Sequence, residues 1–147
     1  MTGQLLAIWL KSMRRGPMLP RQHAELKAGR GIVDNTDQGG RRQVTILSSE
    51  RWDHVTGELG AELEPSKRRA NFLVSSIELE DTRGRTLRIG GCRLRVLGET
   101  RPCERMDEAL PGLQEAMRRD WAGGVFAEVL DDGEVRVGDE VAWEVEE

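Results

Sequence analysis

Hydrophobic and polar residues alternate with a period of two in several short runs, which is the pattern of half-buried β-strands. The clearest example is Thr86-Leu-Arg-Ile89, followed by Gly90-Gly91 and then Cys92-Arg-Leu-Arg-Val-Leu97. A two-residue glycine turn suits a β-hairpin, because glycine readily adopts the positive φ angles that such turns require. We therefore predict a hairpin over these residues, with Cys92 on its inward face as a small hydrophobic side chain.

Other runs predict a mostly β chain with few helices. Further strands are expected at residues 4–11, 43–47, 71–75, 125–130, 134–137 and 140–145. Residues 13–38 are rich in glycine and proline, so we predict a long loop-rich stretch there. Two segments are predicted to be helical: Ser48 and Ser49 offer an N-cap for a helix through Leu59, and residues 106–117 have helical spacing interrupted by Pro111-Gly112. The predicted fold class is a mostly β, barrel-like domain with a few short helices.

Length and composition fit one globular domain over residues 1–147. Hydrophobic residues make up 37% of the chain and charged residues 33%, which allows a packed core. The longest early apolar run, residues 5–10, is too short for a membrane span or an export signal. We therefore expect a cytoplasmic protein without a membrane partner. Two cysteines cannot form a disulfide framework, so both are expected to remain thiols.

Charge is unevenly distributed along the chain. Residues 1–105 carry 19 basic and 13 acidic side chains, whereas residues 106–147 carry 3 basic and 13 acidic ones. Of the 22 basic residues 19 are arginine, which suits planar recognition of phosphate or carboxylate, although a genomic composition bias would give the same count. The net charge of −4, the absence of tyrosine and only six aromatic residues argue against nucleic acid as a partner. A small anionic ligand fits better.

Cys103 is the candidate reactive residue. It lies in Arg101-Pro-Cys-Glu-Arg105, just before a predicted helix, and both arginines favour the thiolate over the thiol. A thiolate there would be a nucleophile, a persulfide carrier or a soft metal ligand. The alternative is an exposed cysteine with no chemical role.

Two cationic segments lead into predicted strands. Lys67-Arg68-Arg69-Ala-Asn71 and Gly39-Gly40-Arg41-Arg42-Gln43 could each hold a phosphate if their side chains converge, and each could equally be a solvated loop. His23 and His54 have no metal-ligand spacing to each other or to a cysteine, which disfavours structural zinc. The signature motifs of serine hydrolases, P-loop NTPases and dinucleotide enzymes do not occur in the sequence.

The ordered set of motifs resembles the MOSC domain, named for the C-terminal domain of molybdenum cofactor sulfurases. The set begins with Gly29-Arg-Gly-Ile32 and continues with Arg42-Gln-Val-Thr-Ile46, Arg69-Ala-Asn71, Arg88-Ile-Gly90, Leu94-Arg-Val96 and Arg101-Pro-Cys103. The resemblance is strongest over residues 29–138. It implies a β-barrel-like fold and a cleft for the pterin-based molybdenum cofactor (molybdopterin).

The resemblance also implies roles for individual residues. Cys103 would be the functional cysteine, carrying sulfur as a persulfide or ligating molybdenum. The residues expected to bind the anionic and pterin parts of the cofactor are Arg69, Asn71, Gln43, Arg42, Arg68 and Arg101.

Two departures from the family pattern limit what the resemblance implies. Many members continue the Gly-Ile pair into a Gly-Asp-Arg-His-like run, whereas this chain reads Val33-Asp-Asn-Thr-Asp-Gln38. The pyridoxal-phosphate domain of the sulfurase is absent from these 147 residues, so a partner protein would have to deliver sulfur or electrons. Three functions therefore remain open: a cofactor-binding sulfur carrier, a molybdenum-dependent reductase of N-hydroxylated compounds, and a non-catalytic binding or scaffold module.

Overall fold

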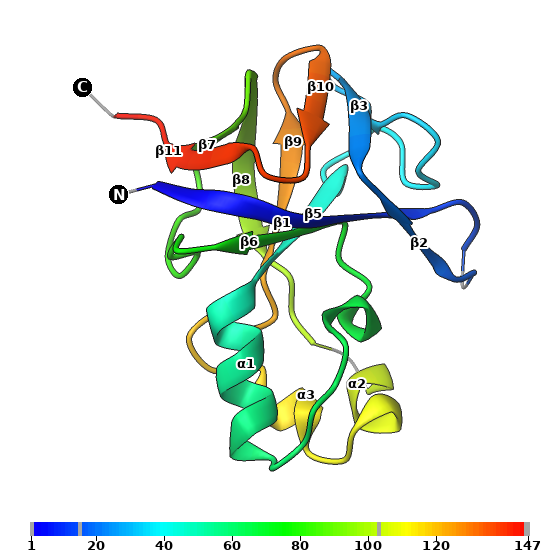
Figure 1. Ribbon diagram of the computed structural model, residues 1–147, viewed down its shortest axis with the longest axis vertical. Helices are drawn as coiled ribbons and strands as arrows, with labels where there is room; N and C mark the ends of the chain where they lie inside the picture. The colour runs from blue at the N-terminus through cyan, green and yellow to red at the C-terminus, as the bar shows by residue number, and fades with distance from the viewer. Residues whose placement is uncertain (1, 15, 103, 146–147) are drawn as a thin grey trace.

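Seven strands of the chain form the wall of a β-barrel (Figure 1). The computed structural model describes residues 2–14, 16–102 and 104–145, and every structural statement refers to these residues. The barrel strands are β1 (Thr2–Lys11), β5 (Val44–Ser48), β6 (Phe72–Ser75), β7 (Thr86–Ile89), β8 (Cys92–Glu99), β9 (Val125–Val129) and β11 (Glu140–Trp143). They hydrogen-bond in the order β11-β7-β8-β9-β5-β6-β1, and the pairing of β1 with β11 closes the barrel. The predicted fold class is confirmed.

The predicted hairpin is present with the expected register. Leu87 pairs with Leu94 and Ile89 with Cys92, so the apolar side chains of β7 and β8 face the barrel interior. Cys92 is 1% exposed, which confirms its inward position. Alternation along each strand therefore fills the barrel core, because successive side chains of a strand point to opposite faces.

Residues 13–38 contain three short strands, so the prediction of a loop-rich stretch is wrong for those parts. These strands are β2 (Met18–Arg21), β3 (His23–Lys27) and β4 (Gly31–Ile32). β2 extends the sheet beside β1, while β3 pairs with both β4 and β10 (Gly133–Arg136) in a separate three-stranded sheet. Pro20 lies on β2, at the edge of the sheet, where proline is tolerated. Pairing with distant strands outweighs the turn-forming composition of this region.

Helices gather at one end of the barrel. They are α1 (Ser49–Glu58), the 3₁₀ helix η1 (Pro65–Arg68), α2 (Arg105–Ala109) and α3 (Leu113–Ala116). The Ser48 hydroxyl caps α1 by accepting a hydrogen bond from the Arg51 backbone N–H at 3.2 Å, as the sequence predicts. Trp52 and Val55 of α1 pack into a second hydrophobic cluster, which joins the helices to the outside of the barrel. The predicted break at Pro111-Gly112 separates α2 from α3.

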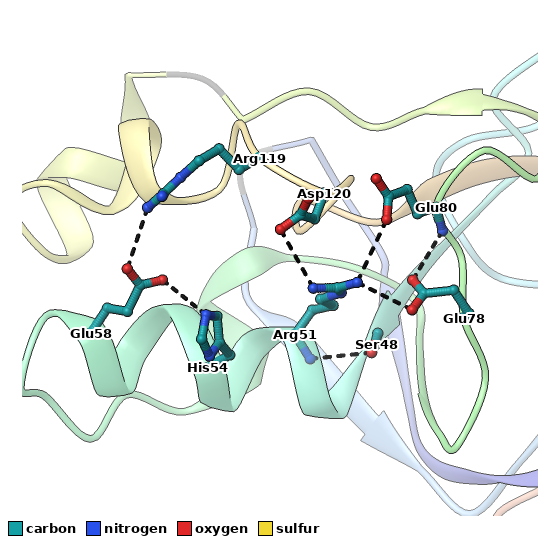
Figure 2. A network of polar contacts seen from close by, with 8 residues as sticks. All are labelled: Ser48, Arg51, His54, Glu58, Glu78, Glu80, Arg119 and Asp120. Carbon is teal, nitrogen blue, oxygen red and sulfur yellow. Dashed lines mark hydrogen bonds and ion pairs between the residues drawn. The ribbon is translucent and has the colours of Figure 1, made fainter.

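A polar network fastens α1 to the loops around it (Figure 2). The Arg51 guanidinium contacts Glu78 at 3.1 Å and both Glu80 and Asp120 at 3.6 Å. Near the end of α1, Glu58 contacts His54 at 3.1 Å and Arg119 at 3.3 Å. These exposed pairs contribute modestly to stability, but they bind residues 119–120 to α1.

None of the helices described is long and apolar enough to cross a membrane.

We expect the barrel interior, rather than its outer surface, to dominate stability. Leu94→Ala should lower the free energy of unfolding by about 2–5 kcal/mol, because Leu94 is fully buried and its loss leaves a cavity. Leu6→Ala is the matched control, since Leu6 is 39% exposed, and should cost less than about 1 kcal/mol. Urea unfolding followed by circular dichroism measures both. Equal losses would contradict the inward register of β8.

Candidate functional site

A cavity of about 530 Å³ lies where the end of β1, the starts of β5 and β6, and the residues around α2 come together. Six basic side chains line it: Lys11, Arg14, Arg42, Arg68, Arg69 and Arg105. Asp37 is the one acidic residue among the lining residues that the structure describes. Such an excess of positive charge in a concave site attracts an anionic ligand.

The Asn71 side chain lies in the wall of this cavity and hydrogen-bonds to three different segments of the chain. Its Oδ1 accepts a hydrogen bond from the Thr45 backbone N–H at 3.1 Å, and its Nδ2 donates to the Trp9 carbonyl at 3.1 Å. The same Nδ2 donates to Asn35 Oδ1 at 3.2 Å. Asn71 is 4% exposed. The candidate residue therefore lines the site, as expected, while its amide is occupied in holding β1, β5 and the residue 35 loop together.

Arg68 is a buried cation behind the cavity surface. Its Nε donates to the Gly123 carbonyl at 3.1 Å and its Nη2 donates to the Thr100 carbonyl at 3.0 Å. Gly123 allows this approach, because a Cβ there would lie 2.3 Å from the Thr100 carbonyl oxygen. Arg68 thus ties the segment that leads to Cys103 to the segment that follows α3.

Arg69 and Thr100 offer polar atoms to a ligand. Arg69 has a φ of 65°, which turns the chain sharply at the end of η1. Its Nη2 atom is buried and has no hydrogen-bond partner among the described residues, and the same holds for Thr100 Oγ1. A buried polar atom without a partner costs free energy, so both atoms favour a ligand with hydrogen-bond acceptors. The residues present therefore fit a phosphate-bearing cofactor.

Gln43 and Arg42 separate at the start of β5. Arg42 is exposed, lines the cavity, and stacks its guanidinium 5.8 Å from the centre of the Phe126 ring. Gln43 is buried and does not line the cavity, contrary to the expectation from the sequence. Its amide is used within the fold, because Nε2 donates to the Gly40 carbonyl and Oε1 accepts from the Val129 N–H, both at 2.9 Å.

Arg101 also lies elsewhere than expected. Thr100 lines the main cavity, whereas Arg101 lines a separate hollow of about 420 Å³ with Glu99, Pro102 and Arg118. The two neighbouring side chains lie in different surroundings, since Thr100 is 5% exposed and Arg101 is exposed. Arg101 is therefore not positioned to bind a ligand in the main cavity.

Cys103 lies outside the described residues. Of its neighbours in sequence, Thr100, Arg105 and Met106 line the cavity. No group of three or more histidine, cysteine, aspartate or glutamate side chains that could hold a metal ion occurs in the part of the chain that the structure describes.

Sequence reasoning missed several residues that line the cavity. Lys11 and Arg14 follow the last apolar residue of β1, while Thr36 and Asp37 belong to the run that departs from the MOSC pattern. From the sequence, Arg105 is expected to act on Cys103 but not to line the cleft. No local motif distinguishes these residues, because pairing between distant segments brings them together.

The chain is therefore a β-barrel domain with helices at one end and a cationic cavity suited to an anionic ligand. Its family is shown by comparison of sequences. A family model described as "MOSC domain" matches residues 33–142, so the chain belongs to the MOSC domain family. A search of curated proteins finds no match.

Solved structures share the fold at low sequence identity. The YuaD protein from Bacillus subtilis superposes with a TM-score of 0.79 and 22% identity, covering 96% of this chain and 94% of that one. YiiM from Geobacillus stearothermophilus gives 0.76 and 16%, covering 97% and 75%. YiiM from Escherichia coli gives 0.73 and 12%, covering 97% and 70%.

Arg68 should contribute to the site mainly by stabilising the folded chain around it. We expect Arg68→Met to lower the free energy of unfolding by about 2–4 kcal/mol, because two buried carbonyls lose a charged donor. The neighbouring Lys67 is exposed, so Lys67→Met should change it by less than about 0.5 kcal/mol. Urea unfolding measures both variants. Similar values for the two would mean that the carbonyl contacts of Arg68 contribute nothing measurable.

Proposed function

We propose that the cationic cavity binds the molybdenum cofactor and that Cys103 is its functional cysteine, as persulfide carrier or molybdenum ligand. The observation that carries this proposal is the pair of unpartnered buried atoms, Arg69 Nη2 and Thr100 Oγ1, in a cavity lined by six basic side chains. Membership of the MOSC domain family supports the identity of the ligand.

The chain's own residues would bind and orient this ligand. Arg69 would donate charge-assisted hydrogen bonds to the phosphate, and Thr100 would donate its hydroxyl to a nearby oxygen. Arg42 and Arg105, both exposed at the cavity, would supply further positive charge. When bound, the cofactor would contribute a redox-active metal with affinity for soft ligands.

The proposed role of Cys103 rests on its neighbours. Thr100 and Arg105 both line the cavity, and Arg101 and Arg105 favour the thiolate form of a cysteine between them. A thiolate can bind molybdenum directly or hold a transferable sulfur atom. Either chemistry needs sulfur or electrons from outside the site, so the proposal includes a donor protein as partner.

Cofactor uptake tests the ligand assignment. Protein purified from a host that makes the cofactor should contain about one molybdenum per chain, measured by metal analysis and pterin fluorescence. Arg69→Ala should weaken cofactor binding about ten- to a hundredfold, because a buried charge-assisted contact is lost. Arg83→Ala is the control, since Arg83 is exposed in a turn outside the cavity.

Two results would contradict the assignment. Repeated failure to bind supplied cofactor would favour a scaffold role for the domain. Equal effects of Arg69→Ala and Arg83→Ala would show that the ligand binds outside this cavity.

The two cysteines provide an internal test of the thiol chemistry. Burial raises the pKa of the Cys92 thiol, and the nearby carboxylates of Asp131, Asp139 and Asp132 raise it further. Cys103 should therefore be alkylated by iodoacetamide near pH 7 roughly ten times faster or more, with mass spectrometry locating the adduct. Bound cofactor should slow this reaction.

Substitution of Cys103 completes the test. Cys103→Ser should abolish sulfur transfer or reduction while leaving the circular dichroism spectrum unchanged, because the hydroxyl is a harder ligand of similar size. Faster alkylation of Cys92, or full cofactor-dependent activity in Cys103→Ser, would exclude the proposed role.

A further inference from the structure

Residues 33–38, where this chain departs from the MOSC pattern, are firmly attached to the end of β1. Asn35 Oδ1 accepts a hydrogen bond from the Lys11 backbone N–H at 2.8 Å, and the Thr36 N–H donates to the Lys11 carbonyl at 2.6 Å. Gln38 Nε2 closes the turn by donating to the Ile32 carbonyl at 2.7 Å and the Asn35 carbonyl at 2.9 Å. These contacts fix the position of Asp37 between Thr36 and Gln38.

The attachment brings a carboxylate into a site that is otherwise basic. Asp37 Oδ2 lies 3.6 Å from Lys11 Nζ, and both residues line the cavity. The side chains are 44% and 24% exposed respectively, so a ligand can reach both.

A carboxylate in this position opposes the binding of a simple anion. It repels the anion directly, and it engages Lys11, whose ammonium would otherwise attract that anion. The same carboxylate accepts hydrogen bonds readily from paired N–H groups on a planar ring, because its two oxygens match two parallel donors. Asp37 therefore weakens the binding of simple anions and strengthens the binding of ligands whose planar rings carry paired N–H groups.

We propose that Asp37 is a specificity-determining residue of the cavity, which selects ligands that join an anionic group to a ring with paired N–H donors over simple anions. The ligand's anion would take the place of Asp37 beside Lys11, and its N–H groups would bind the freed carboxylate. This inference rests on the proposed function, because it assumes that the cavity takes an anionic ligand.

The test compares two probes and two substitutions by isothermal titration calorimetry at one low ionic strength. Inorganic pyrophosphate is the simple anion, and guanosine 5′-monophosphate combines a phosphate with a ring N–H and an adjacent amino group. Asp37→Asn removes the carboxylate charge. Asp34→Asn is the matched control, because Asp34 lies in the same segment, is exposed and does not line the cavity.

The two probes should respond in opposite directions. In Asp37→Asn, the dissociation constant of pyrophosphate should fall about two- to fivefold, as expected for the loss of a partly exposed ion pair. The dissociation constant of guanosine 5′-monophosphate should rise at least about threefold, because an amide offers one acceptor in place of two. Asp34→Asn should change neither value by more than about 1.5-fold, because Asp34 is exposed to water and does not line the cavity.

Several outcomes would overturn the inference. If Asp37→Asn tightens both probes by the same factor, Asp37 acts only through its charge. If neither dissociation constant changes, Asp37 does not act on ligands of this cavity. If neither probe binds to the unsubstituted chain or to Asp37→Asn, the inference is also overturned, because the described lining of the variant cavity would contain six basic residues and no acidic one.

The same measurements separate this inference from the proposed function. An opposite shift of the two probes without uptake of molybdenum cofactor would support the role of Asp37 and contradict the cofactor assignment. Cofactor uptake that depends on Arg69, together with an unchanged probe ratio in Asp37→Asn, would do the reverse.

Discussion

The pairing of β1 with three other strands is the constraint on which the rest of the structure depends. Residues 2–4 pair with β11, residues 4–8 with β6 and residues 8–11 with β2. The pairing of β1 with β6 shifts register between Leu5 and Ala7, which lets β1 pair with both β6 and β11 in the closed barrel. Because β1 ends at Lys11, closure of the barrel also determines where the cationic cavity forms.

Side-chain hydrogen bonds reinforce the backbone pairing in the wall of the cavity. Next to the start of β6, the Asn71 backbone pairs with Trp9 and Thr45, and the Asn71 amide also bonds to the Trp9 carbonyl and the Thr45 N–H, so Asn71 holds the three strands together. The Arg68 guanidinium joins Thr100 to Gly123. Buried polar groups of this kind are stable only when they are hydrogen-bonded, so these residues cannot be exchanged freely for hydrophobic ones. Asn71 and Arg68 therefore hold the walls of the site in place, and Arg69 lines the site with one buried guanidinium nitrogen that has no partner among the described residues.

Local signals predicted the parts of the fold that local chemistry determines. The Gly90-Gly91 hairpin, the Ser48 cap and the break at Pro111-Gly112 are each specified by residues within a few positions of the feature. The strands within residues 18–32 escaped prediction because their stability comes from β1 and β10, far away in sequence.

The same distinction explains the outcome at the candidate site. Arg69 and Asn71 lie close to a strand start and line the cavity, as the motif suggested. The Gln43 amide is occupied by its hydrogen bond with Val129, a partner 86 residues away, and Arg101 is exposed and lines a separate hollow. Lys11 and Asp37 meet only through the long-range attachment of residues 33–38 to β1.

Folding pairs many of the acidic and basic residues that are unevenly distributed along the sequence. The acidic C-terminal part is brought against basic residues from the first 105, as in the contacts of Asp131 with Arg93 and Asp120 with Arg51. The hydrogen bonds from Arg93 lower the pKa of Asp131, which keeps its carboxylate ionised. Carboxylates paired in this way do not reach the main cavity, where Asp37 alone, among the described lining residues, offsets six basic side chains. An acidic protein can therefore contain a strongly anion-attracting site, because ligand binding depends on the charges that line the cavity and much less on the net charge of the chain.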